Sequence, residues 1–262
     1  MRSLFLILLT IGVSHIVAAQ ANNLPPELRN VGITEKLGDQ IPGDITFINE
    51  QGEEVRFDEF LSRGKPLIIT PIYYECPMLC NLILNGVTYG MQDLAWQIGR
   101  DFEVLTFSID PDESYELARD NKESYLRLLG KPEVSDGWHF LTADQQNIDR
   151  MTDAIGFGFE WSDEAQEFMH GSSIMFVSPD GMITRYLYGI EYTELNLRNA
   201  LFDAADGKIG TTMDRIMLFC YTFDPDSRSY VPNALNIMKL GGLLTLTFLG
   251  IFLGLLWFRK SA

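Results

Sequence analysis

The sequence has few cysteines and few basic residues, and each shortage excludes a class of protein. Three cysteines in 262 residues are too few to hold a fold as a disulfide framework, so a nearby thiol pair is better suited to chemistry. Lys and Arg number 20 against 36 Asp and Glu, which gives a net charge of −16. So acidic a surface repels phosphate backbones, and we expect no nucleic-acid partner. With 46% hydrophobic residues the chain still has enough apolar material for a core.

Both ends of the chain lack Asp and Glu and carry apolar segments. Residues 1–19 combine one cation, a short apolar stretch and small residues, which predicts a signal peptide cleaved after Ala19 rather than an uncleaved anchor. Residues 240–258 hold no charged side chain and would span roughly 28 Å as a helix, so residues 239–262 are predicted to form a transmembrane helix with a short cytoplasmic tail. The expected location is the inner membrane of a bacterium, with the globular part in the periplasm.

Strand-like and helix-like segments alternate between these two ends. Residues 20–43 are predicted to form an extended arm, 44–205 the globular domain, and 206–238 an extension with a helix over 211–221 and a loop over 224–232. A hairpin is expected over 45–57, strands over 66–73, 102–109, 138–141, 173–177 and 184–188, and helices over 80–98, 114–129, 145–155 and 194–204. This order predicts a three-layer α/β sandwich around a mixed sheet, with an N-terminal β-hairpin.

Two thiols stand where a predicted strand ends and the next helix begins, in the segment PIYYECPMLCN. If Cys80 lies in the first helical turn, Cys76 and Cys80 point toward the same place, and the helix N-terminus favours their thiolates. The pair is therefore a metal-binding clamp, a redox couple, or both. The alternatives without a chemical role are a plain disulfide and two inert buried thiols.

A histidine adds a possible third ligand. Without the signal peptide the chain keeps only His139, inside a predicted strand, and His170, just before one. Two thiolates and one imidazole suit copper in either oxidation state, or zinc with a fourth ligand. Three ligands favour copper, and His170 is the better candidate. A hydrogen-bonded structural role for His170 is the alternative.

Four segments, ECPMLCN, FSIDPDES, GWHFLT and HGSSIMFVSPDG, resemble the SCO/SenC family in their order and separations. That family consists of thioredoxin-fold, copper-binding proteins that assist cytochrome c oxidase assembly. The resemblance covers about residues 24–205 and implies a thioredoxin-like fold for the domain. It also implies that Cys76, Cys80 and His170 ligate one copper ion, Cu(I) or Cu(II), for the dinuclear copper site of the oxidase. The Cys76–Cys80 pair would then be able to cycle between dithiol and disulfide.

The sequence departs from the family pattern beside the expected ligands. Many members read CPDxCP, whereas this chain has Met78 and Asn81 at the Asp and the second Pro, and Met169 where an Asp often precedes the histidine. Without an Asp at these two positions, the expected metal site lacks hydrogen-bond acceptors that would orient its ligands. Met78 offers a thioether, but packing is the more usual role of a methionine. Cys220 is expected to be a buried free thiol, and the alternative is that it lies near the copper site.

Three functions are compatible with these residues. The first is a non-enzymatic copper carrier whose partner is the copper-bearing subunit of cytochrome c oxidase or another copper or thiol acceptor. The second is a thiol–disulfide reductase that uses Cys76 and Cys80 as its redox pair. The third is a membrane-bound redox or copper sensor. Of the first two, only the carrier needs His170.

Overall fold

The computed structural model describes residues 30–207, 221–224, 229–232, 242 and 245, which fall into two units with a boundary after Ile209. The predicted signal peptide lies outside the described residues, and so does the predicted transmembrane segment apart from residues 242 and 245. Within the described part of the chain, no helix has the length and apolar character needed to cross a bilayer.

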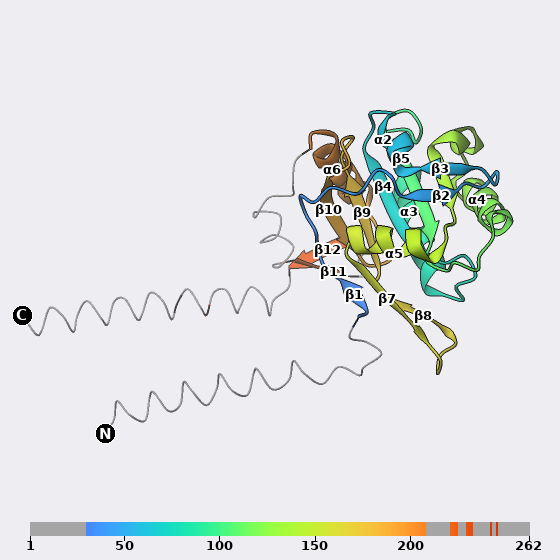
Figure 1. Cartoon of the computed structure of the whole chain (residues 1–262). Helices are drawn as coiled ribbons and strands as arrows, with labels where there is room; N and C mark the ends of the chain where they lie inside the picture. Colours follow the sequence, from blue (N-terminus) through green and yellow to red (C-terminus); the bar gives the residue numbers. More distant parts are fainter. Residues whose placement is uncertain (1–29, 208–220, 225–228, 233–241, 243–244, 246–262) are drawn as a thin grey trace, which may run out of the picture. The chain divides into compact units, whose positions relative to one another are not determined.

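The first unit is built on a five-stranded mixed sheet (Figure 1). Its strand order is β10 (Ile183–Tyr188), β9 (Ser173–Val177), β4 (Leu67–Ile72), β5 (Glu103–Ser108) and β6 (Trp138–Leu141). Strands β4, β5 and β6 are parallel, whereas β9 is antiparallel to both β4 and β10. Every residue of β4 and β5 is buried, as apolar, β-branched central strands require. The predicted strands are therefore confirmed.

Helices and a hairpin cover the two faces of this sheet. These elements are α3 (Leu79–Gln92), α4 (Tyr115–Leu129), α6 (Glu194–Ala205), β2 (Thr46–Ile48), β3 (Glu54–Arg56), α2 (Phe57–Leu61), α5 (Gln145–Ala154) and the 3-10 helix η2 (Pro132–Gly137). On one face Tyr125 of α4 packs against Trp138 and Phe140 of β6, and α3 contacts both α4 and α6. On the other face Phe47 of the β2–β3 hairpin packs against Phe107 of β5, and Asn147 of α5 accepts a hydrogen bond from that hairpin. The three-layer α/β sandwich with an N-terminal β-hairpin is confirmed.

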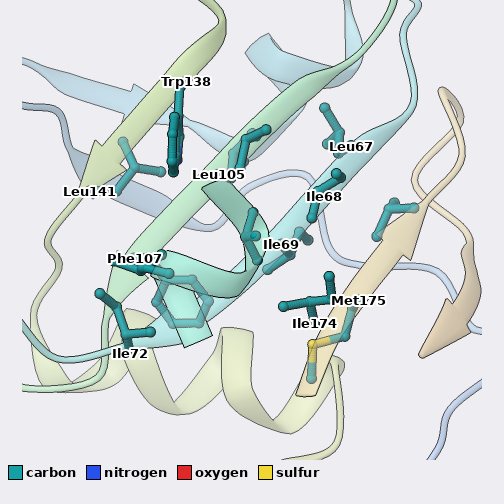
Figure 2. Packing of buried hydrophobic residues seen from close by; sticks show 14 of the residues in the cluster. Leu67, Ile68, Ile69, Ile72, Leu105, Phe107, Trp138, Leu141, Ile174 and Met175 are labelled. Atoms are coloured by element: carbon teal, nitrogen blue, oxygen red, sulfur yellow. The ribbon is translucent and has the colours of Figure 1, made fainter. Parts of the chain in front are cut away.

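The core lies between these layers and fixes the strand from which the thiols extend. Apolar side chains of β4, β5, β6 and β9 meet in one cluster (Figure 2), in which Leu67, Ile69 and Trp138 are fully buried. Each such side chain stabilises the fold by about 1.5–3 kcal/mol through its removal from water. Strand β4 is therefore a rigid base, and it ends at Ile72, four residues before Cys76.

A second, three-stranded sheet carries His170. It consists of β1 (Gly32–Ile33), β7 (Phe157–Ser162) and β8 (Glu167–His170), all antiparallel (Figure 1). No element is predicted for residues 157–170, although Phe157, Phe159 and Trp161 alternate as strand residues do. Part of the predicted arm thus pairs with a hairpin that was not predicted.

The helix predicted over residues 80–98 is too long at its C-terminal end. Helix α3 ends at Gln92, and the following segment forms a turn in which the backbone N–H of Gln97 donates to the Asp101 carboxylate at 2.8 Å. Leu94 and Ile98 are buried, as their spacing indicated, but they belong to the segment after the helix and not to the helix itself. The periodicity therefore identified the buried residues correctly, while the Asp101 side chain favours a turn over continuation of the helix.

The second unit contains an antiparallel strand pair, β11 (Tyr221–Asp224) with β12 (Ser229–Pro232). The loop predicted over residues 224–232 is therefore wrong at residue 224 and residues 229–232, where aromatic and β-branched residues such as Tyr230 and Val231 favour a strand, whereas residues 225–228 lie outside the described residues. The helix predicted over residues 211–221 lies outside the described residues, as does Cys220, except that Tyr221 begins a strand.

Candidate metal centre

Cys76, Cys80 and His170 come together beyond the C-terminal end of β4. Their ligand atoms all lie within 4.8 Å of one another, and the Cys80 Sγ and His170 Nε2 atoms are 3.3 Å apart. All three residues are buried, with 5%, 2% and 9% of their surface exposed. Sulfur and nitrogen atoms bound at about 2.0–2.3 Å to one ion lie roughly 3–4.5 Å apart. The donor atoms thus have the chemistry and the separation of a three-ligand metal site.

Backbone amides and one side chain hold the two thiols at the start of α3. The backbone N–H of Cys80 donates to the Cys76 sulfur at 3.3 Å, and that of Tyr73 donates to the Cys80 sulfur at 3.5 Å. Asn81 donates from its amide to the Cys76 carbonyl at 3.0 Å and accepts from the Tyr125 hydroxyl at 3.1 Å. Asn81 stands at a position that is often Pro in the family pattern. It therefore connects the cysteine loop, residues 73–78 between β4 and α3, to α4.

The hydrogen bonds of His170 determine which ring nitrogen is available. Its Nδ1 lies 2.9 Å from the Gly171 carbonyl oxygen, so Nδ1 carries the proton and the Nε2 lone pair faces the sulfurs. The ring also packs against Tyr73 and Phe157. A backbone carbonyl thus orients this imidazole, a role for which sequence analysis considered only acidic side chains.

The two thiols differ in charge. The hydrogen bond from the Cys80 thiol, followed by those from the backbone amides of Cys80 and Met78, lowers the pKa of Cys76 to about 3 despite its burial. Burial, followed by the bond to Cys76, raises the pKa of Cys80 well above its usual range. At neutral pH the site therefore holds one thiolate and one thiol that share a hydrogen bond.

The lowered pKa of Cys76 and the raised pKa of Cys80 predict a single thiolate per metal-free site across a wide pH range. The ultraviolet thiolate absorbance of the reduced chain should stay constant from about pH 8 down to pH 5 and fall only as the pH approaches about 3, because protonation of Cys76 occurs there. The Cys76→Ser variant is the control and should lack this absorbance. A titration midpoint near the free-cysteine value in the wild-type chain would contradict the assignment.

Glu113 is a site residue that sequence analysis missed. Its buried carboxylate accepts the backbone N–H groups of Tyr74 and Glu75, at 2.8 and 2.7 Å, and the Ser108 hydroxyl. Burial raises the pKa of Glu113. The residue belongs to the segment FSIDPDES, but its contact with the cysteine loop depends on the pairing of β4 with β5, which one sequence does not reveal.

Replacing Glu113 with Ala should loosen the cysteine loop, because the amides of Tyr74 and Glu75 lose their acceptor. We expect metal affinity to fall about 10–100-fold, as for other groups that orient ligands, measured by competition with a chelator. The exposed neighbour Glu75 is the matched control, and Glu75→Ala should bind metal like the wild-type chain. Equal affinities for all three proteins would show that Glu113 does not position the loop.

The side chains of the other two candidates, His139 and Met78, have different surroundings from those of the three ligands. His139 packs on Phe60 and its Nε2 is 3.1 Å from the buried Glu103 carboxylate, which Arg63 and Lys65 also contact. Met78 is 68% exposed. The preference for His170 over His139 therefore agrees with the geometry, and Met78 is oriented toward solvent rather than packed.

Comparison with known proteins identifies relatives of this chain. The SCO1/SenC family model matches residues 34–201. The SCO1 protein homolog of Bacillus subtilis (strain 168) is 26% identical over 159 residues, which span 57% of this chain and 74% of the relative. Among solved structures, a candidate electron transfer protein from Aquifex aeolicus VF5 is 31% identical with a TM-score of 0.59, covering 68% of this chain and 98% of the other. Arabidopsis thaliana ScoI, solved with copper bound, is 17% identical with a TM-score of 0.51 over 64% of this chain and 99% of the other, which shows the shared thioredoxin-like fold.

Proposed function

This chain belongs to the SCO1/SenC family, and we propose that it is a copper carrier that binds one ion through Cys76, Cys80 and His170 and delivers it to the dinuclear copper site of cytochrome c oxidase during assembly. The observation that carries this proposal is the convergence of a thiolate, a thiol and an imidazole lone pair within 4.8 Å. Soft thiolates with imidazole favour copper. The copper-bound form of the plant relative supports the same choice.

The charge state of the metal-free site indicates how capture and release proceed. Cys76 is already a thiolate and His170 already presents a free lone pair, so only Cys80 must lose its proton when the ion binds. Binding should therefore release about one proton per ion at neutral pH. Three ligands leave room for an acceptor sulfur to coordinate the same ion, which permits transfer by ligand exchange without turnover of a substrate.

The two apolar ends suggest where this transfer takes place. We propose that residues 1–19 direct export and that residues 239–262 anchor the chain in the inner membrane, with the copper site in the periplasm. Tethering confines the carrier to the membrane that holds the oxidase. The acidic domain is suited to a basic patch on the copper-bearing subunit or on another copper or thiol acceptor.

A copper titration of the full chain with reduced cysteines tests the carrier. We expect one Cu(I) per chain in competition with a chelator, a sulfur-to-metal charge-transfer band with Cu(II), and transfer to the purified metal-free copper-bearing subunit. Cys76→Ser and Cys80→Ser should each lose tight binding, whereas Cys220→Ser should retain it as the matched cysteine control. Unchanged binding in Cys76→Ser would refute the proposed ligand set.

A thiol–disulfide reductase is the second candidate, and one observation favours it. The low pKa of Cys76 beside a protonated Cys80 is the pattern of an attacking thiolate with a resolving thiol. In this case the pair would reduce the cysteines of an acceptor through a mixed disulfide. This activity needs both thiols and does not need the imidazole of His170.

A further inference from the structure

The Tyr73 side chain is buried beside the metal centre with its hydroxyl unsatisfied. Only 6% of the residue is exposed, and the hydroxyl has no hydrogen-bond partner of good geometry among the described residues. A buried polar group without a partner is costly, so such an atom in a well-packed site calls for a functional explanation.

The surroundings of Tyr73 connect it to all three ligands. Its backbone donates to the Cys80 sulfur at 3.5 Å and accepts from the Cys76 amide at 3.3 Å, while its ring lies edge-on to His170 with centroids 6.1 Å apart. Burial raises the pKa of Tyr73, and the interaction of its hydroxyl with the Cys76 sulfur acts in the same direction. The Cys76 sulfur is therefore a neighbour of this hydroxyl, although the pair does not have the geometry of a formed hydrogen bond.

We propose that Tyr73 is a positioning residue whose hydroxyl donates a hydrogen bond to the Cys76 sulfur when that sulfur ligates copper, and that this bond favours the dithiol form of the pair over its disulfide. The copper part of this inference rests on the proposed function. The redox part depends only on the thiols. The hydroxyl gives up no other partner among the described residues when it forms this bond.

The chemistry of sulfur sets the direction of the effect. A charged thiolate or a copper-bound thiolate accepts a hydrogen bond well, whereas a disulfide sulfur accepts poorly. When oxidised glutathione oxidises the pair, the glutathione disulfide breaks and takes up two electrons as the Cys76–Cys80 bond forms, and the Cys80 proton and one proton from water complete the two reduced glutathiones. The Tyr73 hydrogen bond is lost in this step, so it opposes oxidation.

Tyr73→Phe tests the proposal, because it removes only the hydroxyl. In the full chain we expect the equilibrium constant for oxidation by glutathione to rise about tenfold, which for this two-electron couple is a potential about 30 mV more negative. With Cu(II) bound, the sulfur-to-copper charge-transfer band should move to longer wavelength, because the sulfur electrons are less stabilised.

Tyr74→Phe is the matched control. Tyr74 is equally buried, but its hydroxyl donates to the Leu141 carbonyl at 2.8 Å, inside the core. We expect no change in the potential or the band for this variant. Equal shifts in both variants would indicate a general packing effect and would overturn the proposal, as would an unchanged potential in Tyr73→Phe.

A second variant keeps the test decisive if Tyr73→Phe does not fold. Fluorotyrosine at position 73 retains the hydroxyl and makes it a stronger donor, so the potential and the band should move in the opposite directions. No shift would refute the hydrogen bond. If the wild-type chain binds no copper, the proposed function fails, and the potential alone decides the role of Tyr73.

Discussion

His170→Ala should abolish tight copper binding while leaving thiol–disulfide exchange largely intact. Loss of a group that only orients a ligand costs about 10–100-fold in affinity, so loss of the ligand itself should exceed about 100-fold. The largest contribution to the low pKa of Cys76 comes from Cys80, not from His170, so the thiolate that drives exchange should persist. Competition titration with Cu(I) and the rate of reaction with a model disulfide measure the two effects on one sample.

His139→Ala is the control for this experiment. His139 is the other histidine of the described residues, and it faces Glu103 rather than the sulfurs. This variant should lose some stability and keep its copper affinity. Full copper affinity in His170→Ala would remove the imidazole from the site and would leave the reductase as the better account of the two cysteines.

Gly86→Ala should strongly destabilise the domain, although alanine is the better helix former. A Cβ at residue 86 would lie 2.0 Å from the Ile190 carbonyl oxygen, and one at Gly90 would lie 2.3 Å from that of Tyr192. Helix α3 therefore packs directly on the backbone that follows β10. The intrinsic gain of about 1 kcal/mol from Gly to Ala is outweighed by displacement of the helix, and we expect a net loss of about 3 kcal/mol in the free energy of unfolding.

Urea denaturation measures this loss, with Asn85→Ala as the control on the same helix. Asn85 is half-buried next to Gly86, and its replacement by Ala should change the free energy of unfolding by less than about 1 kcal/mol. Because Cys80 is on α3, Gly86→Ala should also weaken metal binding. A more stable Gly86→Ala variant would mean that intrinsic helix propensity outweighs the close packing of α3.

Local patterns were sufficient to predict the central sheet and the thiol pair. Strand β4 is a continuous apolar run, and Cys76 and Cys80 lie within one short segment, so both features depend on neighbouring residues. His170 could be chosen because so few histidines compete with it. Glu113 and the Gly171 carbonyl could not be predicted, because their roles arise only when distant strands pair. The β7–β8 hairpin was missed because its alternating aromatics are interrupted by polar residues at the turn.

The placement of the cysteines at the start of α3 and of His170 at the end of β8 has a consequence for how the protein matures. Cys80 and His170 stand 90 residues apart, and they meet only after β9 has inserted beside β4. Contacts of such sequence separation form late, because the intervening chain must first be ordered. In a nascent chain, the sulfurs of Cys76 and Cys80 are therefore available to a metal ion before the nitrogen of His170 reaches them. Coordination by all three ligands requires a folded domain.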